Sequence, residues 1–129
     1  MDNRDIALRF IEEVWEQRTP DAVFRFTAPE FIDHAYLPGT AAGHARMVDT
    51  FCAAFSASRH AIEHIVADDE MVLMRLRVSA THTGTFREHE ARGALIDLQQ
   101  YRSFRFRHGR MVEHWALLDT AALLRQIGT

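Results

Sequence analysis

The feature that most constrains the fold of this 129-residue chain is a single change in the period of its hydrophobic residues. Up to about residue 57 the period is about 3.6 residues, which is typical of amphipathic helices, and beyond it the period falls to about 2, which is typical of strands. Helices grouped before long strands indicate an α+β domain. We therefore expect one α+β domain over residues 1–129, with helices packed on a strongly curved antiparallel sheet that encloses a conical interior.

The boundaries of the expected elements follow from this periodicity and from proline and glycine punctuation. Three N-terminal helices are expected, over residues 3–17, from residue 19 to residue 26, and over 44–57. Strands are expected over residues 31–35, 60–67, 71–82, 95–107 and 111–118, and a short C-terminal helix over 120–127.

Composition excludes several classes of protein. The formal net charge is -3 and the pI about 6.2, so there is no general attraction to nucleic acid or to an anionic membrane. No apolar run reaches the length of a membrane span, and the polar N-terminus lacks the hydrophobic region of a signal peptide. Cys52 is the only cysteine, which excludes an internal disulfide and fits a reducing compartment. We expect a cytoplasmic protein.

Five stretches carry a family resemblance. In chain order they are RFIEEVWEQ, FIDHA, DDEMVLMRLRVSATHTGTF, FRFRHGRMVEHWALLDT and LLRQIG. Taken together in this order and at these separations, the chain resembles the SnoaL-like polyketide cyclases of the NTF2-like superfamily, whose domains are cystatin-like cones. The resemblance covers nearly the whole length.

The resemblance implies a cyclase that closes a ring in a hydrophobic, polyketide-like ester or ketone by intramolecular aldol condensation. It implies acid/base catalysis without a metal or an organic cofactor. The family's catalytic aspartate, at the end of the last strand, matches Asp119, and an aromatic residue lining the family's pocket matches Trp15. The chain departs from the pattern where Arg102 replaces a pocket histidine and where the loop over residues 87–93 keeps only Gly93.

Asp119 has two interpretations. As an acid/base group it needs an apolar site that raises its pKa toward neutrality. It also directly precedes an expected helix, so it is a candidate N-cap, and a cap has a lowered pKa instead. Asp119→Asn distinguishes the two, because asparagine caps nearly as well but cannot accept a proton; a catalytic Asp119 predicts lost turnover with retained stability.

Other candidates follow from strand alternation. Arg102 shares a side with Phe104 and Phe106, which predicts an inward guanidinium that either stabilises an oxyanion or pairs with an acid such as Asp97 or Glu113. His34 and His82 are candidates for hydrogen bonds to substrate or for structural roles. Because only one of His114 and Trp115 can face inward, we expect Trp115, which shares parity with Asp119. The predicted catalytic residues are Asp119, Arg102 and His34, and the predicted substrate-binding residues are Trp15, His82, Trp115 and Phe104.

The sequence favours no metal site, since His60 and His64 lie on an expected strand, where residues four apart are too distant to share an ion. Three alternatives to the cyclase stay open. They are other acid/base chemistry in the same pocket, such as ketone isomerisation, hydration or hydrolysis; a small-ligand-binding domain without turnover; and a partner-binding domain. Outward residues such as Leu73 and Tyr101 predict a homodimer through the sheet.

Overall fold

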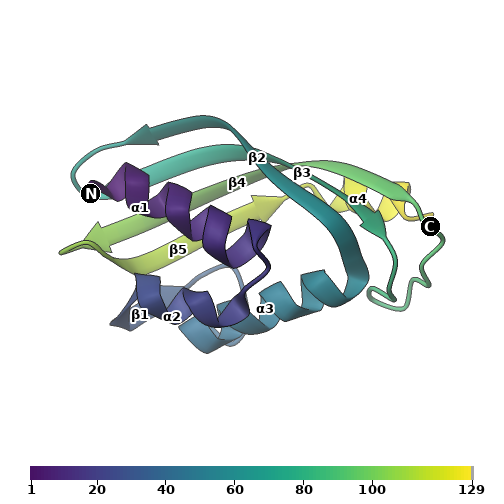
Figure 1. Cartoon of the computed structure of the whole chain (residues 1–129), viewed down its shortest axis with the longest axis horizontal. Helices are drawn as coiled ribbons and strands as arrows, with labels where there is room; N and C mark the ends of the chain where they lie inside the picture. The colour runs from purple at the N-terminus through teal and green to yellow at the C-terminus, as the bar shows by residue number, and fades with distance from the viewer. Residues whose placement is uncertain (129) are drawn as a thin grey trace.

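A computed structural model of the chain describes residues 1–128 (Figure 1). The helices in this part are α1 (Asn3–Phe10), the π-helical η1 (Ile11–Glu16), the 3-10 turn η2 (Pro20–Ala22), α2 (Val23–Phe26), α3 (Ala41–Ala54) and α4 (Thr120–Gln126). The strands are β1 (Thr27–Asp33), β2 (Phe55–Ala67), β3 (Met71–His82), β4 (Leu95–Arg107) and β5 (Arg110–Leu118). The expected α+β class is confirmed.

The five strands form one sheet in the order β1-β5-β4-β3-β2. Strands β2 to β5 are antiparallel to their neighbours, as expected, but β1 pairs with β5 in parallel, so the expectation of a purely antiparallel sheet is wrong at this edge. A short hairpin makes two consecutive strands antiparallel, but it does not determine the direction of a strand that pairs with one distant in sequence. β1 precedes α3 and meets β5 across the whole chain, where Asp33 pairs with His114.

The sheet curves over the helices, and α1 and α3 lie on its concave side (Figure 1). The two termini lie at opposite ends of the long axis, with α4 and the loop over residues 83–94 at the C-terminal end (Figure 1). One hydrophobic cluster packs α1, η1 and α3 against the inner faces of β3 and β4, and a second joins β3 and β4 to α4. This arrangement leaves a hollow between the clusters rather than one continuous core.

Most boundaries agree with the sequence. β3 and β4 have the expected limits, and Thr40 starts α3 three residues early, because its side-chain oxygen accepts a hydrogen bond from the Gly43 N–H at 3.1 Å. The first helix continues past Phe10 as a π-helix. None of the helices described is long and apolar enough to cross a membrane.

A β-bulge changes which side chains of β5 face inward. Arg105 of β4 pairs with Glu113, but the next residue, Phe106, pairs with Met111, so Val112 is an extra residue without a partner. The alternation shifts there, and His114 is fully buried while Trp115 is partly exposed. The expectation that Trp115 faces the interior is therefore wrong.

Candidate active site

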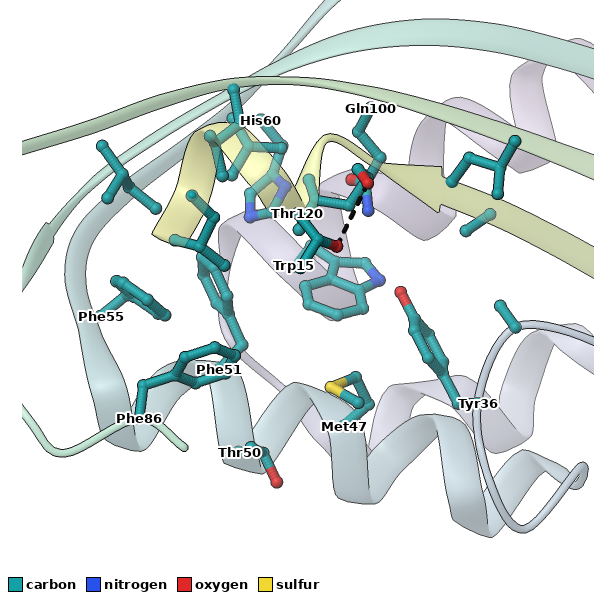
Figure 2. Close-up of a pocket in the computed structure, with 18 of the residues that line it drawn as sticks. Trp15, Tyr36, Met47, Thr50, Phe51, Phe55, His60, Phe86, Gln100 and Thr120 are labelled. Atoms are coloured by element: carbon teal, nitrogen blue, oxygen red, sulfur yellow. Dashed lines mark hydrogen bonds between the residues drawn. The ribbon is translucent and has the colours of Figure 1, made fainter. Parts of the chain in front are cut away.

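A cavity of about 430 Å³ opens between the concave face of the sheet, η1, α3 and α4. Aromatic side chains from α3, β2 and the 83–94 loop (Phe51, Phe55 and Phe86) form one side of it (Figure 2). Trp15, Tyr36 and Gln100 lie toward the other side, and His60 lies above Phe51 (Figure 2). Arg102 also lines the cavity, and within residues 1–128 the lining contains no aspartate or glutamate. The cavity is therefore mainly apolar, with a polar end that carries positive charge.

Behind the polar end lies Asp33, the last residue of β1, with a relative exposure of 3%. One of its oxygens accepts hydrogen bonds from the Ala35 N–H at 2.8 Å, the Tyr36 N–H at 3.3 Å and His114 Nδ1 at 3.1 Å. The other accepts from His44 Nδ1 at 2.8 Å. Burial alone would raise the pKa of Asp33, but the hydrogen bonds from the two histidines outweigh it and hold the pKa well below its ordinary value. Asp33 is thus an ionised anchor, not a proton donor.

The partners of the two histidines define their tautomers. The indole N–H of Trp15 donates to His44 Nε2 at 3.2 Å, and Arg102 Nη1 donates to His114 Nε2 at 3.1 Å. Indole and guanidinium groups can only donate, so each Nε2 is an acceptor and each Nδ1 carries the proton given to Asp33. Burial lowers the pKa of His114 to about 3, against the opposing effect of Asp33.

This network connects one carboxylate to three residues that line the cavity, two through their side chains and one through its backbone. Asp33 is linked to Arg102 through His114, and to Trp15 through His44. It also accepts a hydrogen bond directly from the backbone N–H of Tyr36. The three cavity residues come from β4, η1 and the segment after β1, so a single acid fixes parts of the wall that are distant in sequence.

The trio of Asp33, His44 and His114 also has the composition of a metal site, since its ligand atoms lie within 4.8 Å of one another. A metal ion would need the nitrogen lone pairs that point toward Asp33. Each Nε2 accepts a hydrogen bond, so each Nδ1, the atom that faces Asp33, carries a proton and has no lone pair for a metal ion. The trio is therefore a hydrogen-bonded network.

Arg102 is only 2% exposed and makes no ion pair within residues 1–128. The acids suggested by the sequence are engaged elsewhere: Asp97 pairs with Arg77, and Glu113 with Arg105. The Arg102 guanidinium lies 4.5 Å from the centre of the Trp15 ring, and its Nε has no hydrogen-bond acceptor in the part of the chain described. The prediction that Arg102 points inward is confirmed.

Two further polar groups of the cavity have no hydrogen-bond partner in the part of the chain that the structure describes. Both ring nitrogens of His60, and Oε1 of Gln100, are buried without a hydrogen bond to any described residue. Burial, and then the charges of Arg102 and Arg18, lower the pKa of His60 to about 3. His60 is therefore neutral at physiological pH, with a free lone pair.

The other predicted site residues lie elsewhere. Asp119 is exposed, and its side chain accepts a hydrogen bond from the Ala122 N–H at 3.0 Å, so it caps α4 and is not among the residues of the described chain that line the cavity. His34 stacks on Trp115 with ring centroids 4.8 Å apart and bonds Glu113 at 2.8 Å, outside the cavity. The catalytic roles of Asp119 and His34 stay predictions.

His82 and Phe104 are fully buried but do not line the cavity as the described residues define it. The His82 ring packs 5.2 Å from that of Phe55, and Phe104 packs between Phe10 and His114 in the core. Their predicted contact with substrate is therefore not supported by position. Trp15 and Arg102 are the predicted residues that the structure brings together.

The sequence carried signals for the residues that were missed. His44 precedes Val48 and Phe51 by four and seven residues, so it belongs to the apolar face of α3. Asp33 alternates with the buried Phe31, on the opposite side of β1 from His34. His60 is inward on β2 by the same pattern.

The curved sheet, the helices beneath it and the enclosed cavity define a cone of the NTF2-like fold. The chain matches the SnoaL-like polyketide cyclase family over residues 5–127, and it belongs to that family. No curated protein matches it significantly.

Solved structures agree on the fold. A proposed polyketide cyclase from Acidithiobacillus ferrooxidans is 25% identical, with a TM-score of 0.84 over 97% of this chain and 93% of the other. IdmH, a proposed polyketide cyclase from Streptomyces antibioticus, is 22% identical, with a TM-score of 0.85 over all of both chains. AclR, a proposed hydroxylase from Streptomyces galilaeus, is 21% identical, with a TM-score of 0.87 over 98% of this chain and 84% of the other.

Proposed function

We propose that this chain is a cofactor-independent cyclase that closes a ring in a hydrophobic, polyketide-like substrate by intramolecular aldol condensation. One observation carries the proposal: a buried guanidinium, Arg102, without an acidic partner in residues 1–128, lines the polar end of an otherwise apolar cavity. Family membership, and the likeness to proteins described as polyketide cyclases, support the substrate class.

The reaction would begin with loss of a proton from a carbon next to a carbonyl group. The C–H electron pair forms a carbon–carbon double bond, and the carbonyl oxygen becomes an enolate. A fixed cation in a water-poor cavity stabilises that oxygen far more than it would in bulk solvent. Arg102 fills this role because the His114–Asp33 chain holds it in place before the charge develops.

His60 is the base that this geometry favours. It lines the cavity, is neutral, and has no partner for either nitrogen within the described chain. Burial is the largest cause of its low pKa, and the charge of Arg102 is the next. An enolate forming at Arg102 offsets that charge, so the basicity of His60 increases as the proton moves.

The remaining steps form the new carbon–carbon bond and return the proton to the substrate. The enolate carbon attacks a second carbonyl carbon of the same molecule, and the new C–C bond leaves a negative alkoxide oxygen. The imidazolium of His60 returns its proton to that oxygen. Ketone isomerisation shares the first step, and NMR of the product separates ring closure from migration of a double bond.

Asp119 and His60 are competing assignments for the acid/base group, and one pair of variants decides between them. With enolisable aromatic polyketide esters and ketones as substrates, we expect His60→Gln to reduce kcat by roughly 100-fold. Asp119→Asn, which keeps the cap, should leave kcat close to that of the wild type. The opposite pattern would restore Asp119 as the catalytic group and reject His60.

A further inference from the structure

We infer that the polar end of the cavity binds its ligand as an anion whose charge is shared by two oxygen atoms, and so selects a free acid or an acidic 1,3-dicarbonyl over a neutral ester. The inference rests on the proposed function, because it concerns the same cavity. It adds the ionisation state of the bound substrate: a carboxylate would anchor a substrate from which His60 then takes a proton, whereas a 1,3-dicarbonyl that binds as its enolate has already lost that proton in solution.

The first support is the charge of Arg102. Its side chain is 2% exposed, and the one hydrogen bond that it makes within residues 1–128 goes to a neutral histidine, His114. The nearest acid in the network, Asp33, lies behind His114 and already accepts four hydrogen bonds from other groups. A buried cation without a directly bonded anion is unfavourable, and a ligand anion at Arg102 would relieve this.

The second support is the sign of charge around the cavity. Among the lining residues in the described chain, the charged side chains are Arg102 and Arg87, and none is acidic. Arg87 belongs to the 83–94 loop, where its guanidinium lies 5.2 Å from the centre of the Phe86 ring. The charge of the exposed Arg87 is screened by solvent, so the buried charge of Arg102 dominates the potential at the polar end and favours a negative ligand over a neutral one.

The third support is a set of buried polar atoms that have no hydrogen-bond partner among residues 1–128. Arg102 Nε needs an acceptor, Gln100 Oε1 needs a donor, and His60 offers one of each. Buried polar atoms are normally hydrogen-bonded, so unpartnered ones beside a cavity indicate groups of a ligand. An oxyanion next to a hydroxyl would satisfy Arg102 and Gln100 together.

The shape of the cavity describes the rest of the ligand. Figure 2 shows Phe51, Phe55 and Phe86 on the side away from Gln100 and Tyr36. A flat hydrophobic body fits against these rings while its charged head lies at the polar end. A guanidinium recognises two oxygens that share one charge, and both a carboxylate and the enolate of a 1,3-dicarbonyl have this form.

The test compares matched anionic and neutral probes by calorimetric titration of the full chain at pH 7.5. One pair is 2-naphthoate with methyl 2-naphthoate; the other is 2-acetyl-1,3-cyclohexanedione, ionised at this pH, with its neutral enol methyl ether. We expect each anion to bind about 10- to 100-fold more tightly than its neutral partner, the range of one charge-assisted contact. Whichever pair shows the larger ratio identifies the source of the oxyanion.

Two variants locate the preference. Arg102→Met should abolish it, whereas Arg105→Met, which removes a cation already paired with Glu70 and Glu113, should leave it intact. Equal or tighter binding of the neutral probes to the wild type overturns the inference, and so does failure of both anions to bind at millimolar concentration. A preference that persists in Arg102→Met but vanishes in Arg87→Met also overturns it.

These measurements are independent of turnover. A chain that selects anions but never closes a ring keeps this inference and refutes the proposed reaction. A chain that cyclises neutral esters and shows no preference for anions keeps the proposed reaction and refutes this inference.

Discussion

Acidification from pH 7 to pH 5 should destabilise this protein strongly, and the amount follows from two buried histidines. The pKa of His60 and that of His114 are each lowered to about 3, mainly by burial, from an ordinary value of 6.5. Below pH 6.5 the unfolded chain therefore binds protons that the folded chain does not, and stability falls as the pH falls. The sign is the same for His44, whose pKa burial also lowers.

The magnitude is set by proton linkage. Between pH 7 and pH 5 each of His60 and His114 should remove about 2 kcal/mol of the free energy of unfolding, or about 4 kcal/mol together. This is a large part of the roughly 5–15 kcal/mol that holds a typical domain folded. The lowered pKa of Asp33 acts in the same direction, but only at pH values below its ordinary 3.8.

Urea unfolding followed by tryptophan fluorescence at several pH values measures this loss. His60→Gln keeps a polar side chain but cannot titrate, so its loss between pH 7 and pH 5 should be about 2 kcal/mol smaller than that of the wild type. His64→Gln, at an exposed position on the same strand, is the matched control and should change the loss little. A wild-type loss under about 1 kcal/mol, or equal losses in the two variants, would refute the reasoning.

Two further predictions concern the anchor and the outer face. Asp33→Asn places an amide N–H against a histidine Nδ1–H, so one histidine must change tautomer. We expect a loss of about 3 kcal/mol in the free energy of unfolding, measured in urea, together with altered histidine ¹⁵N chemical shifts. Unchanged shifts would contradict the network. Leu73 and Tyr101 are 47% and 54% exposed on the sheet, and we propose that they belong to a homodimer interface. Tyr101→Glu should then halve the mass seen by light scattering, whereas a wild type that is already monomeric would reject the dimer.

The sequence predicted best those elements whose pattern is long and regular. β3 and β4 alternate without interruption over their whole lengths, so their limits and the inward direction of Arg102 could be derived locally. The direction of Trp115 could not, because the bulge at Val112 exists only in the pairing of β5 with β4. Local patterns report on a strand by itself, whereas register depends on its neighbour.

The network behind the cavity was missed for a related reason. Asp33, His44 and His114 come from β1, α3 and β5, and each alone is a polar residue in an apolar pattern. Such a residue is interpretable only when its partner is known, since burial without a hydrogen bond would be unfavourable. Asp119 illustrates the opposite case: its local signal, a polar residue before a helix, already offered the cap as one of two interpretations, and the structure contains that cap.

Arg102, at the position where the family resemblance implies a pocket histidine, is best understood together with Asp33. A permanent cation at this position raises the free energy of the empty cavity. The charge of Asp33 compensates that of Arg102 only in part, because His114 lies between the two groups. Because Asp33 is fixed by four hydrogen bonds, it cannot move closer to neutralise Arg102. The distance between Arg102 and Asp33 keeps the cation available to an incoming oxyanion, while the two opposite charges leave the network neutral as a whole. A variant that places an acid beside Arg102, such as Ala116→Asp at the position that pairs with it on β5, should therefore weaken anion binding without disturbing the anchor.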